Sequence, residues 1–407
     1  MEPEIQSLAR ADLPAGTGAN ETSSHEPADP DLHPHRNPDW FLIGDQGLRA
    51  GWAVAFFVIL YRLFVLILGA LAVSLYPAVG EYGFSLATAL VSELVLFLAL
   101  LGAAALVALF EQRRIVEYNL TGPRRPLNFF SGVAAGFLAL SALVGMLAWG
   151  GWLRFVSGTL TWTGVVKFGA LWGCAFLLVG CVEEGIFRCF LQFTLTRGIN
   201  FWWALGIVAV VCLDLLLRSR GYPGVIAFLW MESPHAITGS GMWGVFAVAL
   251  LGLLPCFVLH QKNAARSAFW QAAWVTSTLF GFVHTGNHGE NWIGIFAAAA
   301  IGFVFCVSVW VTGSAWWAIG CHAAWDWAET FFYGTADSGF ASRRHFLTTN
   351  PAGNALWSGG ADGPEGSLLV LAAILLLLAA LLAIYGPKRA AAPDPSGPGA
   401  GRGLAEG

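Results

Sequence analysis

Long apolar runs alternate with short polar connections along most of this chain. As α-helices, runs of this length cross a hydrocarbon core of about 30 Å. A shorter run, 201–217, is interrupted by Asp214, and including it gives about ten spans. The pattern predicts an all-α polytopic transmembrane helical bundle of about 8–10 spans. The other expected spans are 50–76, 84–110, 128–150, 163–195, 240–260, 266–284, 292–312, 314–333 and 367–385.

The two ends of the chain have a different composition. Residues 1–48 are rich in Pro, Asp, Ser and His without periodicity, and residues 387–407 are rich in Ala, Pro and Gly. Such segments cannot bury enough apolar surface to offset the entropy lost on ordering. We therefore predict a disordered tail at each end. Between the tails, the apolar runs predict N-terminal transmembrane helices over 49–160, a loop over 334–366 and a C-terminal transmembrane helix over 367–386.

Composition supports the membrane class and excludes others. The chain is 57% hydrophobic and 11% charged, with a mean hydropathy of +0.65. Its net charge of −4 provides no basic field for nucleic acid, so nucleic-acid binding is set aside. All seven cysteines fall in apolar runs without a CxxC pair, and we interpret them as small buried residues rather than disulfides or metal ligands.

The basic residues are distributed unevenly between the two sides of an alternating ten-span arrangement. Because Lys and Arg are enriched in cytoplasmic loops, this bias predicts a multi-pass protein of the cell membrane with both termini cytoplasmic. The expected cytoplasmic side holds Arg36, Arg49, Arg113, Arg114, Arg124, Arg125, Arg197, Lys262, Arg266, Lys388 and Arg389, and the opposite side keeps Arg154, Arg218, Arg220, Arg343 and Arg344.

Several ionisable residues lie within the apolar spans, where a charge needs a partner or a purpose. Arg62 and Glu93, in the first two spans, are expected to form a structural ion pair. Glu184 and Arg188 are spaced i,i+4 and can neutralise each other on one helix face. Glu183 points about 100° away, so its partner must come from another helix, unless it is protonated.

Two later motifs offer such partners. Phe280 and His284 share one helix face at i,i+4, as do His322 and Asp326 in a later span. Two imidazoles and a free carboxylate in one cavity could deprotonate a water, directly or through a divalent cation. Taken singly, each residue is more simply a hydrogen-bonded packing residue. The polar turn 287–291 is expected to be a solvated loop.

The ordered set Glu-Glu-x3-Arg, Phe-x3-His and His-x3-Asp resembles the three-motif signature of the CPBP family of intramembrane proteases. That family includes type II CAAX prenyl endopeptidases and bacterial bacteriocin-processing or immunity (Abi) proteins. The resemblance covers roughly 163–333 and extends through 359–367. It implies a CPBP-type intramembrane protease core over 161–333, into which a helical segment near 201–260 is inserted.

The resemblance also implies catalytic roles. Glu183 and His284 would position and deprotonate the attacking water, and His322 and Asp326 would stabilise the oxyanion. The family commonly has Asn at the position of Asp326, so this role would require a protonated carboxyl or a bound cation. The implied substrate is a peptide or protein within or at the lipid bilayer: a prenylated C-terminus, a leader peptide or a transmembrane segment.

Supporting and metal-binding roles follow from the same resemblance. Glu184 and Arg188 would support the catalytic residues. Glu183, His284 and His322 form an acceptable zinc set, although HExxH is absent. Counted at about 1.5 Å per residue, these three lie at different depths in the membrane, so only tilted or broken helices would bring them together.

Two other functions remain open at this point. A catalytically silent immunity or scaffold protein could keep these residues for folding. A proton-coupled transporter also uses intramembrane Glu and His, but transport would be favoured by inverted repeats, and we find no internal repeat.

Overall fold

The computed structural model describes residues 41–390 except 45–46, 81–84, 157, 159, 223–239, 265 and 288. The chain forms two units, Met1–Phe41 and Leu42–Gly407, and all the helices named below belong to the second. Most of the two predicted tails lies outside the described residues. Where the tails are described, they are more ordered than predicted, because β1 (Ile43–Gly44) pairs antiparallel with β2 (Gly47–Leu48) and α12 continues to Ala390.

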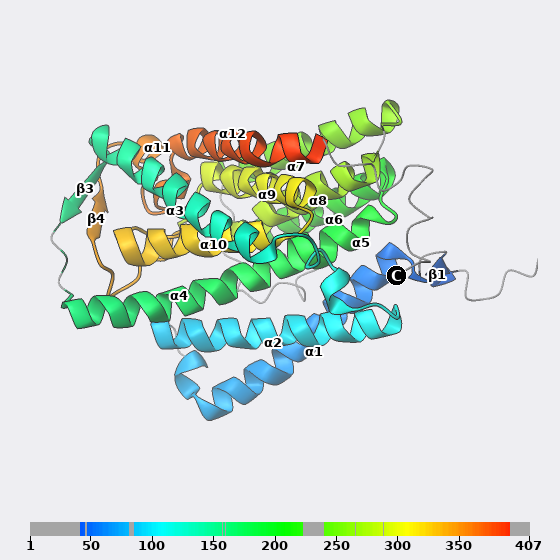
Figure 1. The fold of residues 1–407 in the computed structure, drawn as a ribbon, viewed down its shortest axis with the longest axis horizontal. Helices are drawn as coiled ribbons and strands as arrows, with labels where there is room; N and C mark the ends of the chain where they lie inside the picture. The colour runs from blue at the N-terminus through cyan, green and yellow to red at the C-terminus, as the bar shows by residue number, and fades with distance from the viewer. Residues whose placement is uncertain are drawn as a thin grey trace, which may run out of the picture. The chain divides into compact units, whose positions relative to one another are not determined.

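Helices dominate the second unit, as Figure 1 shows. Eight described helices are long and apolar enough to cross a membrane, and α8 and α10 add two shorter ones. The predicted all-α polytopic bundle is confirmed, and the chain is a multi-pass membrane protein. The α-helices are α1 (Ala50–Leu75), α2 (Leu86–Phe110), α3 (Arg125–Trp149), α4 (Trp162–Glu184), α5 (Gln192–Thr196), α6 (Phe201–Ser219), α7 (Ser240–Gln261), α8 (Ser267–Val283), α9 (Trp292–Thr312), α10 (Trp316–Trp327), α11 (Ala355–Ser358) and α12 (Leu369–Ala390).

Helix α10 packs unusually closely against α3 and α4. A Cβ at Gly132 or Gly136 of α3 would collide with the backbone oxygen of Trp317 or Cys321 in α10. On the α4 side, a Cβ at Gly180 would come within 3.0 Å of a backbone oxygen of α10. Glycines permit such approach because they have no side chain. The helix that carries the third motif is therefore held between two neighbours at backbone distance.

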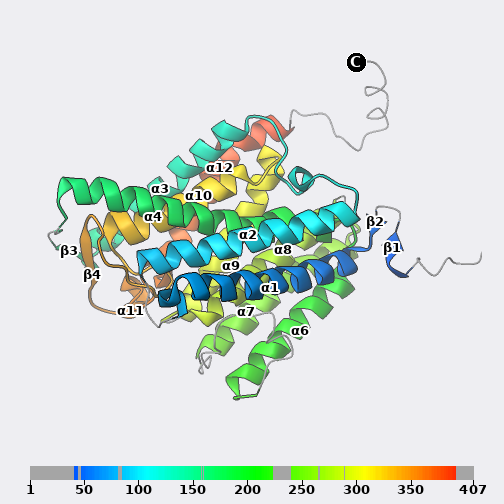
Figure 2. The ribbon, with the colours of Figure 1, turned by 90° about the horizontal axis from the view of Figure 1, so that it is seen from below.

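The segment near 201–260 forms the two helices α6 and α7. These pack against each other, and α7 also packs against α8 and α9 (Figure 2). Asp214, which interrupts the apolar run of α6, is buried and lies 3.6 Å from the guanidinium of Arg218 one turn later. Because this local ion pair lowers the cost of a charge in the apolar run, the helix continues past Asp214.

Hydrogen bonds gather several helix termini at one end of the bundle. Arg197 donates to the backbone oxygen of Leu48 at 2.9 Å and to the Glu111 carboxylate at 2.7 Å. The amide of Ala315 donates to the backbone oxygen of Asn119 at 2.8 Å. The end of α2, the end of α5 and the starts of α1 and α10 therefore lie together. This is the end at which the alternating arrangement placed most of the basic residues.

The opposite end is covered by the segment 334–366, which was predicted to be a loop. It contains α11 and the strand β4 (Thr348–Pro351), which pairs antiparallel with β3 (Leu153–Val156). The amides of Phe346 and Leu347 donate to backbone oxygens at the end of the α10 segment. The segment is thus folded onto the bundle.

Candidate active site

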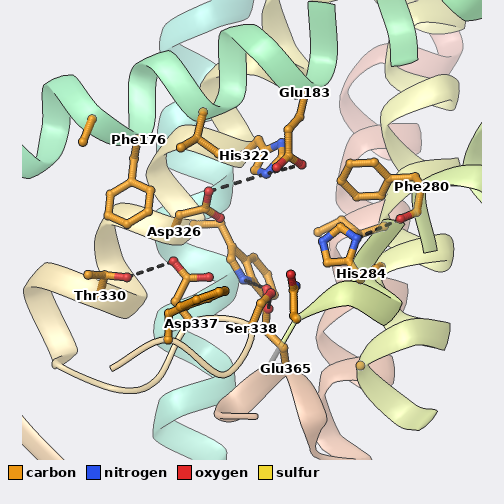
Figure 3. A pocket seen from close by; sticks show the side chains of 18 of the residues that line it. Phe176, Glu183, Phe280, His284, His322, Asp326, Thr330, Asp337, Ser338 and Glu365 are labelled. Atoms are coloured by element: carbon orange, nitrogen blue, oxygen red, sulfur yellow. Dashed lines mark hydrogen bonds and ion pairs between the residues drawn. The ribbon is translucent and has the colours of Figure 1, made fainter. Parts of the chain in front are cut away.

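A cavity of about 460 Å³ lies inside the bundle, near the end covered by segment 334–366. Its walls come from α2, α4, α8, α9, α10, α12 and that segment. The four residues predicted to be catalytic all line it (Figure 3): Glu183, His284, His322 and Asp326. Residues from three separate motifs, the first two about a hundred positions apart, therefore face one space.

Each motif lies where a helix changes form. Glu183 stands two residues before the π-helical turn Gly185–Leu191 that follows α4. His284 comes directly after the last residue of α8, and Asp326 precedes the π-helical turn Ala328–Tyr333 by two residues. Such π-helical turns are frequent at functional sites. Each motif thus lies at a local change in helix geometry, whereas the unequal depths had required tilted or broken helices.

The imidazole of His322 is fixed from behind by Glu184. Its Nδ1 lies 2.8 Å from Glu184 Oε1, and Glu184 Oε2 lies 3.2 Å from Nε of Arg188. The predicted Glu184–Arg188 ion pair is thus present, and both side chains are fully buried. The guanidinium also lies 4.2 Å from the ring centroid of Phe280, a cation–π contact that links the first motif to the second.

The other nitrogen of His322 faces the two remaining carboxylates. His322 Nε2 lies 3.7 Å from Glu183 Oε2 and 3.5 Å from Asp326 Oδ2. The Glu183 side chain is 35% exposed, whereas that of Asp326 is 11% exposed. Glu183 therefore meets a group from another helix, as expected, and keeps part of its carboxylate open to the cavity.

The orientation of His284 follows from one hydrogen bond. Its Nδ1 lies 2.8 Å from the backbone oxygen of Phe280. Because a carbonyl oxygen only accepts, Nδ1 must carry the hydrogen, and a neutral imidazole then has its lone pair on Nε2. Figure 3 shows His284 across the cavity from Asp326. His284 is therefore oriented to act as a base or ligand through Nε2.

The zinc set that the resemblance implied requires donor atoms that lie close to one another. Within the described residues, three or more donor atoms come within 4.8 Å of one another only in Glu329, Asp337 and Glu365. A tetrahedral zinc ion holds its N and O ligands at about 2.0–2.2 Å, which requires donors at close mutual distances. As placed, Glu183, His284 and His322 do not fit one zinc ion.

The sequence did not predict that Glu93 lies in the cavity, and it assigned Glu93 to Arg62 instead. Glu93 of α2 lines the cavity with Glu183. Within the described part of the chain no ion pair joins it to Arg62, so that predicted pair is wrong. Arg62 and Glu93 lie on different helices, and hydropathy does not indicate toward which neighbouring helix each side chain points.

Segment 334–366 contributes further residues that the sequence did not assign. Asp337, Ser338 and Glu365 line the cavity below Asp326 in Figure 3. Glu365 accepts hydrogen bonds from Trp325 Nε1 and Ser338 Oγ, both at 2.8 Å. The stretch 359–367 was part of the resemblance, and its Glu365 lies in the cavity wall.

The turn 287–291 is not the solvated loop that was predicted, although His288 lies outside the described residues. The side chain of Asn291 accepts from the amides at the start of α9 and donates to the backbone oxygen of Gly366 at 3.1 Å. The backbone amide of Asn291 donates to Asp362 Oδ2 at 3.2 Å. Burial and the nearby charge of Asp362 raise the pKa of Glu290 well above its usual range.

Fold and cavity together define a polytopic membrane protein with Glu, His and Asp side chains facing one intramembrane space. Residues 258–328 match the family model described as type II CAAX prenyl endopeptidase Rce1-like. The match supports the CPBP, or CAAX protease, family and, in general terms, a CAAX-type intramembrane protease. The match includes His284, His322 and Asp326 and leaves Glu183 outside. Comparisons with curated proteins and with solved structures give no significant match.

Proposed function

We propose that this chain hydrolyses a peptide bond of a membrane-associated substrate, with the water activated by Glu183 and His284. The observation that carries the proposal is that all four residues implied by the three motifs line one cavity. Ionisable groups inside a membrane are costly, and their convergence on one space is typical of a functional site.

The activating pair has the properties that general-base catalysis requires. Glu183 is partly open to the cavity, and the lone pair of a neutral His284 is on Nε2. Either group can accept a proton from water as the water oxygen attacks the carbonyl carbon. The same proton is then available for the leaving amine. No metal step is needed in this scheme.

In this scheme His322 stabilises the tetrahedral intermediate. Because Glu184 occupies its Nδ1, only Nε2 is directed toward the substrate side. A protonated Nε2 can donate to the oxyanion, and in a site that excludes water such a donor acts strongly. Asp326 contributes to the oxyanion only when its carboxyl is protonated. As a carboxylate it instead orients His322.

The end of the bundle at which the cavity lies indicates from which side of the membrane the substrate enters. Segment 334–366, which contributes to the cavity, covers the end opposite the basic helix termini. With the basic end and both termini cytoplasmic, as we propose, a substrate enters from the other side of the cell membrane. This favours a leader peptide or a membrane-embedded segment over a prenylated C-terminus in the cytoplasm.

The test compares wild type with Glu183→Gln, using Glu117→Gln as a matched control at the basic end. Peptides from membrane and secreted fractions of cells carrying each form are identified by mass spectrometry, and the cleaved candidate is then assayed with purified protein. Peptides should disappear in Glu183→Gln and remain in Glu117→Gln. If Glu183→Gln folds normally and gives the same peptides as wild type, the scaffold or immunity interpretation becomes the better one.

A further inference from the structure

A second group of acidic residues lies beside the cavity and has no role in the mechanism above. Within the described ranges, none of its carboxylates forms an ion pair with Lys or Arg. Several negative charges at low dielectric repel one another unless protons or cations neutralise them. The members are Glu290, Glu329, Asp337, Asp362 and Glu365.

Three of these carboxylates converge on one point. Glu329, Asp337 and Glu365 each place one oxygen within 4.8 Å of the other two. They come from two parts of the chain, since Glu329 lies in the π-helical turn after α10 and the other two lie in segment 334–366.

Glu329 is the independent indication of a ligand. Its side chain is fully buried, and neither of its carboxylate oxygens has a hydrogen-bond partner in the part of the chain that the structure describes. Its backbone oxygen, by contrast, accepts from both the amide and the hydroxyl of Thr335 at 3.0 Å. A buried carboxylate without a partner is costly, and either a proton or a bound cation offsets that cost.

The donor chemistry defines the class of that group. All three donors are carboxylate oxygens, which suit hard cations such as Ca²⁺, Mg²⁺ or Mn²⁺ better than softer metals. Calcium holds its oxygens at about 2.3–2.6 Å, so oxygens on opposite sides of the ion are about 5 Å apart. The observed spacing accommodates such an ion.

Hydrogen bonds from neighbouring residues orient two of the three carboxylates. Thr330 Oγ1 donates to Asp337 Oδ2 at 2.8 Å, and Trp325 and Ser338 both donate to Glu365. Such partners typically fix metal-ligating carboxylates.

We propose that Glu329, Asp337 and Glu365 bind a divalent cation with a preference for Ca²⁺, which fastens segment 334–366 to the end of α10. Asp337 and Glu365 also form part of the cavity wall next to Asp326. The cation therefore shapes that wall without touching Glu183 or His284. Removing the cation with a chelator would weaken cleavage, because this part of the cavity wall would lose its support.

The test uses the purified full chain in lipid nanodiscs after removal of divalent ions with EDTA. Equilibrium binding of radioactive ⁴⁵Ca²⁺ and the thermal unfolding midpoint, followed by tryptophan fluorescence, are measured at increasing Ca²⁺ and separately at increasing Mg²⁺. We expect saturable binding of one Ca²⁺ per chain and a midpoint that rises with its concentration, because a ligand of the folded state stabilises it.

Matched variants separate this site from its surroundings. Glu329→Gln should weaken Ca²⁺ binding by more than about tenfold. Loss of a residue that only hydrogen-bonds to a metal ligand already costs about 10–100-fold in affinity, and Glu329 is proposed to be a ligand itself. Glu290→Gln removes a neighbouring carboxylate that is outside the three and should leave the affinity within about twofold of wild type. Should Glu329→Gln fail to fold, the partly exposed Asp337→Asn and Glu365→Gln provide the same measurement.

Two results would overturn the proposal. One is the absence of saturable Ca²⁺ binding at millimolar concentration, which would mean that shared protons neutralise the cluster. The other is equal loss of affinity in Glu329→Gln and Glu290→Gln. The proposed protease function is tested separately, because Glu183→Gln should lower cleavage by about 10²–10⁴-fold and keep Ca²⁺ binding.

Discussion

The two walls of the cavity neutralise buried carboxylates in different ways. On the α4–α10 wall, Glu184 is matched by Arg188 and by His322, within hydrogen-bonding or ion-pair distance. On the wall made by segment 334–366, Asp337 and Glu365 meet other carboxylates and neutral donors. One wall is balanced by the chain itself, whereas the other needs protons or a cation. We expect substitutions in the first wall to act on catalysis and folding, and those in the second to act through ions and pH.

The largest effect is expected at Glu183, on the α4–α10 wall. Glu183→Gln should lower cleavage by about 10²–10⁴-fold, the range attributed to one general acid or base. Folding should be preserved, because a neutral amide is less costly in the membrane than a carboxylate. Initial rates and the unfolding midpoint are measured on the same preparation. Near-wild-type rates in a folded variant would remove Glu183 from the mechanism.

Breaking the internal ion pair should mainly affect stability. Arg188→Met leaves the Glu184 carboxylate buried without its cation, and removing one partner of a buried pair costs about 3–5 kcal/mol. The yield of folded protein after extraction should fall sharply. Adding Glu184→Gln should restore part of it, because no charge is then left alone. A normal yield for the single variant would show that the pair contributes little to folding.

The oxyanion group should affect rate more than binding. His322→Ala should lower the chemical rate by about 10²–10³-fold, the usual scale for one oxyanion donor. The KM should change much less, because the donor acts mainly in the transition state. Steady-state kinetics on the purified variant separate these terms. A rise in KM at unchanged kcat would instead place His322 in substrate binding.

The smallest effect concerns pH at Glu290, beside the wall made by segment 334–366. Burial and Asp362 raise the pKa of Glu290, and Glu365 and Asp337 act in the same direction. The folded state therefore holds a proton that the unfolded chain releases above its ordinary pKa of about 4.3. This contribution is fully present below that value and is lost as pH rises toward the folded pKa, by at most about 1.4 kcal/mol per pH unit.

Glu290→Gln should flatten this dependence, because the amide does not titrate. The measurement is the unfolding midpoint from pH 5 to 9 in EDTA, so that cation binding does not contribute. Asn287, whose side chain donates to Glu290 at 3.1 Å, remains in place in both proteins. Identical pH slopes for variant and wild type would show that Glu290 is not the titrating group.

Local features of the sequence were sufficient for the helices and for one ion pair. Apolar runs predicted the transmembrane helices because the bilayer requires a fixed length of apolar residues in each span. The i,i+4 spacing predicted Glu184–Arg188 because one helical turn alone brings the two residues together. The order of three motifs predicted a family that the match of residues 258–328 supports, and it predicted the four residues that line the cavity.

Only the tertiary structure decided which distant elements meet. Gly132 and Gly136 were a common small-residue pattern until α10 was found against them. Glu93 was assigned to Arg62 because hydropathy does not show which helix faces which. Glu329 and Glu365 are 36 positions apart, and their convergence depends on segment 334–366 folding back onto the bundle. Periodicity records the environment of one helix, whereas these contacts depend on packing between helices and connections far apart in the chain.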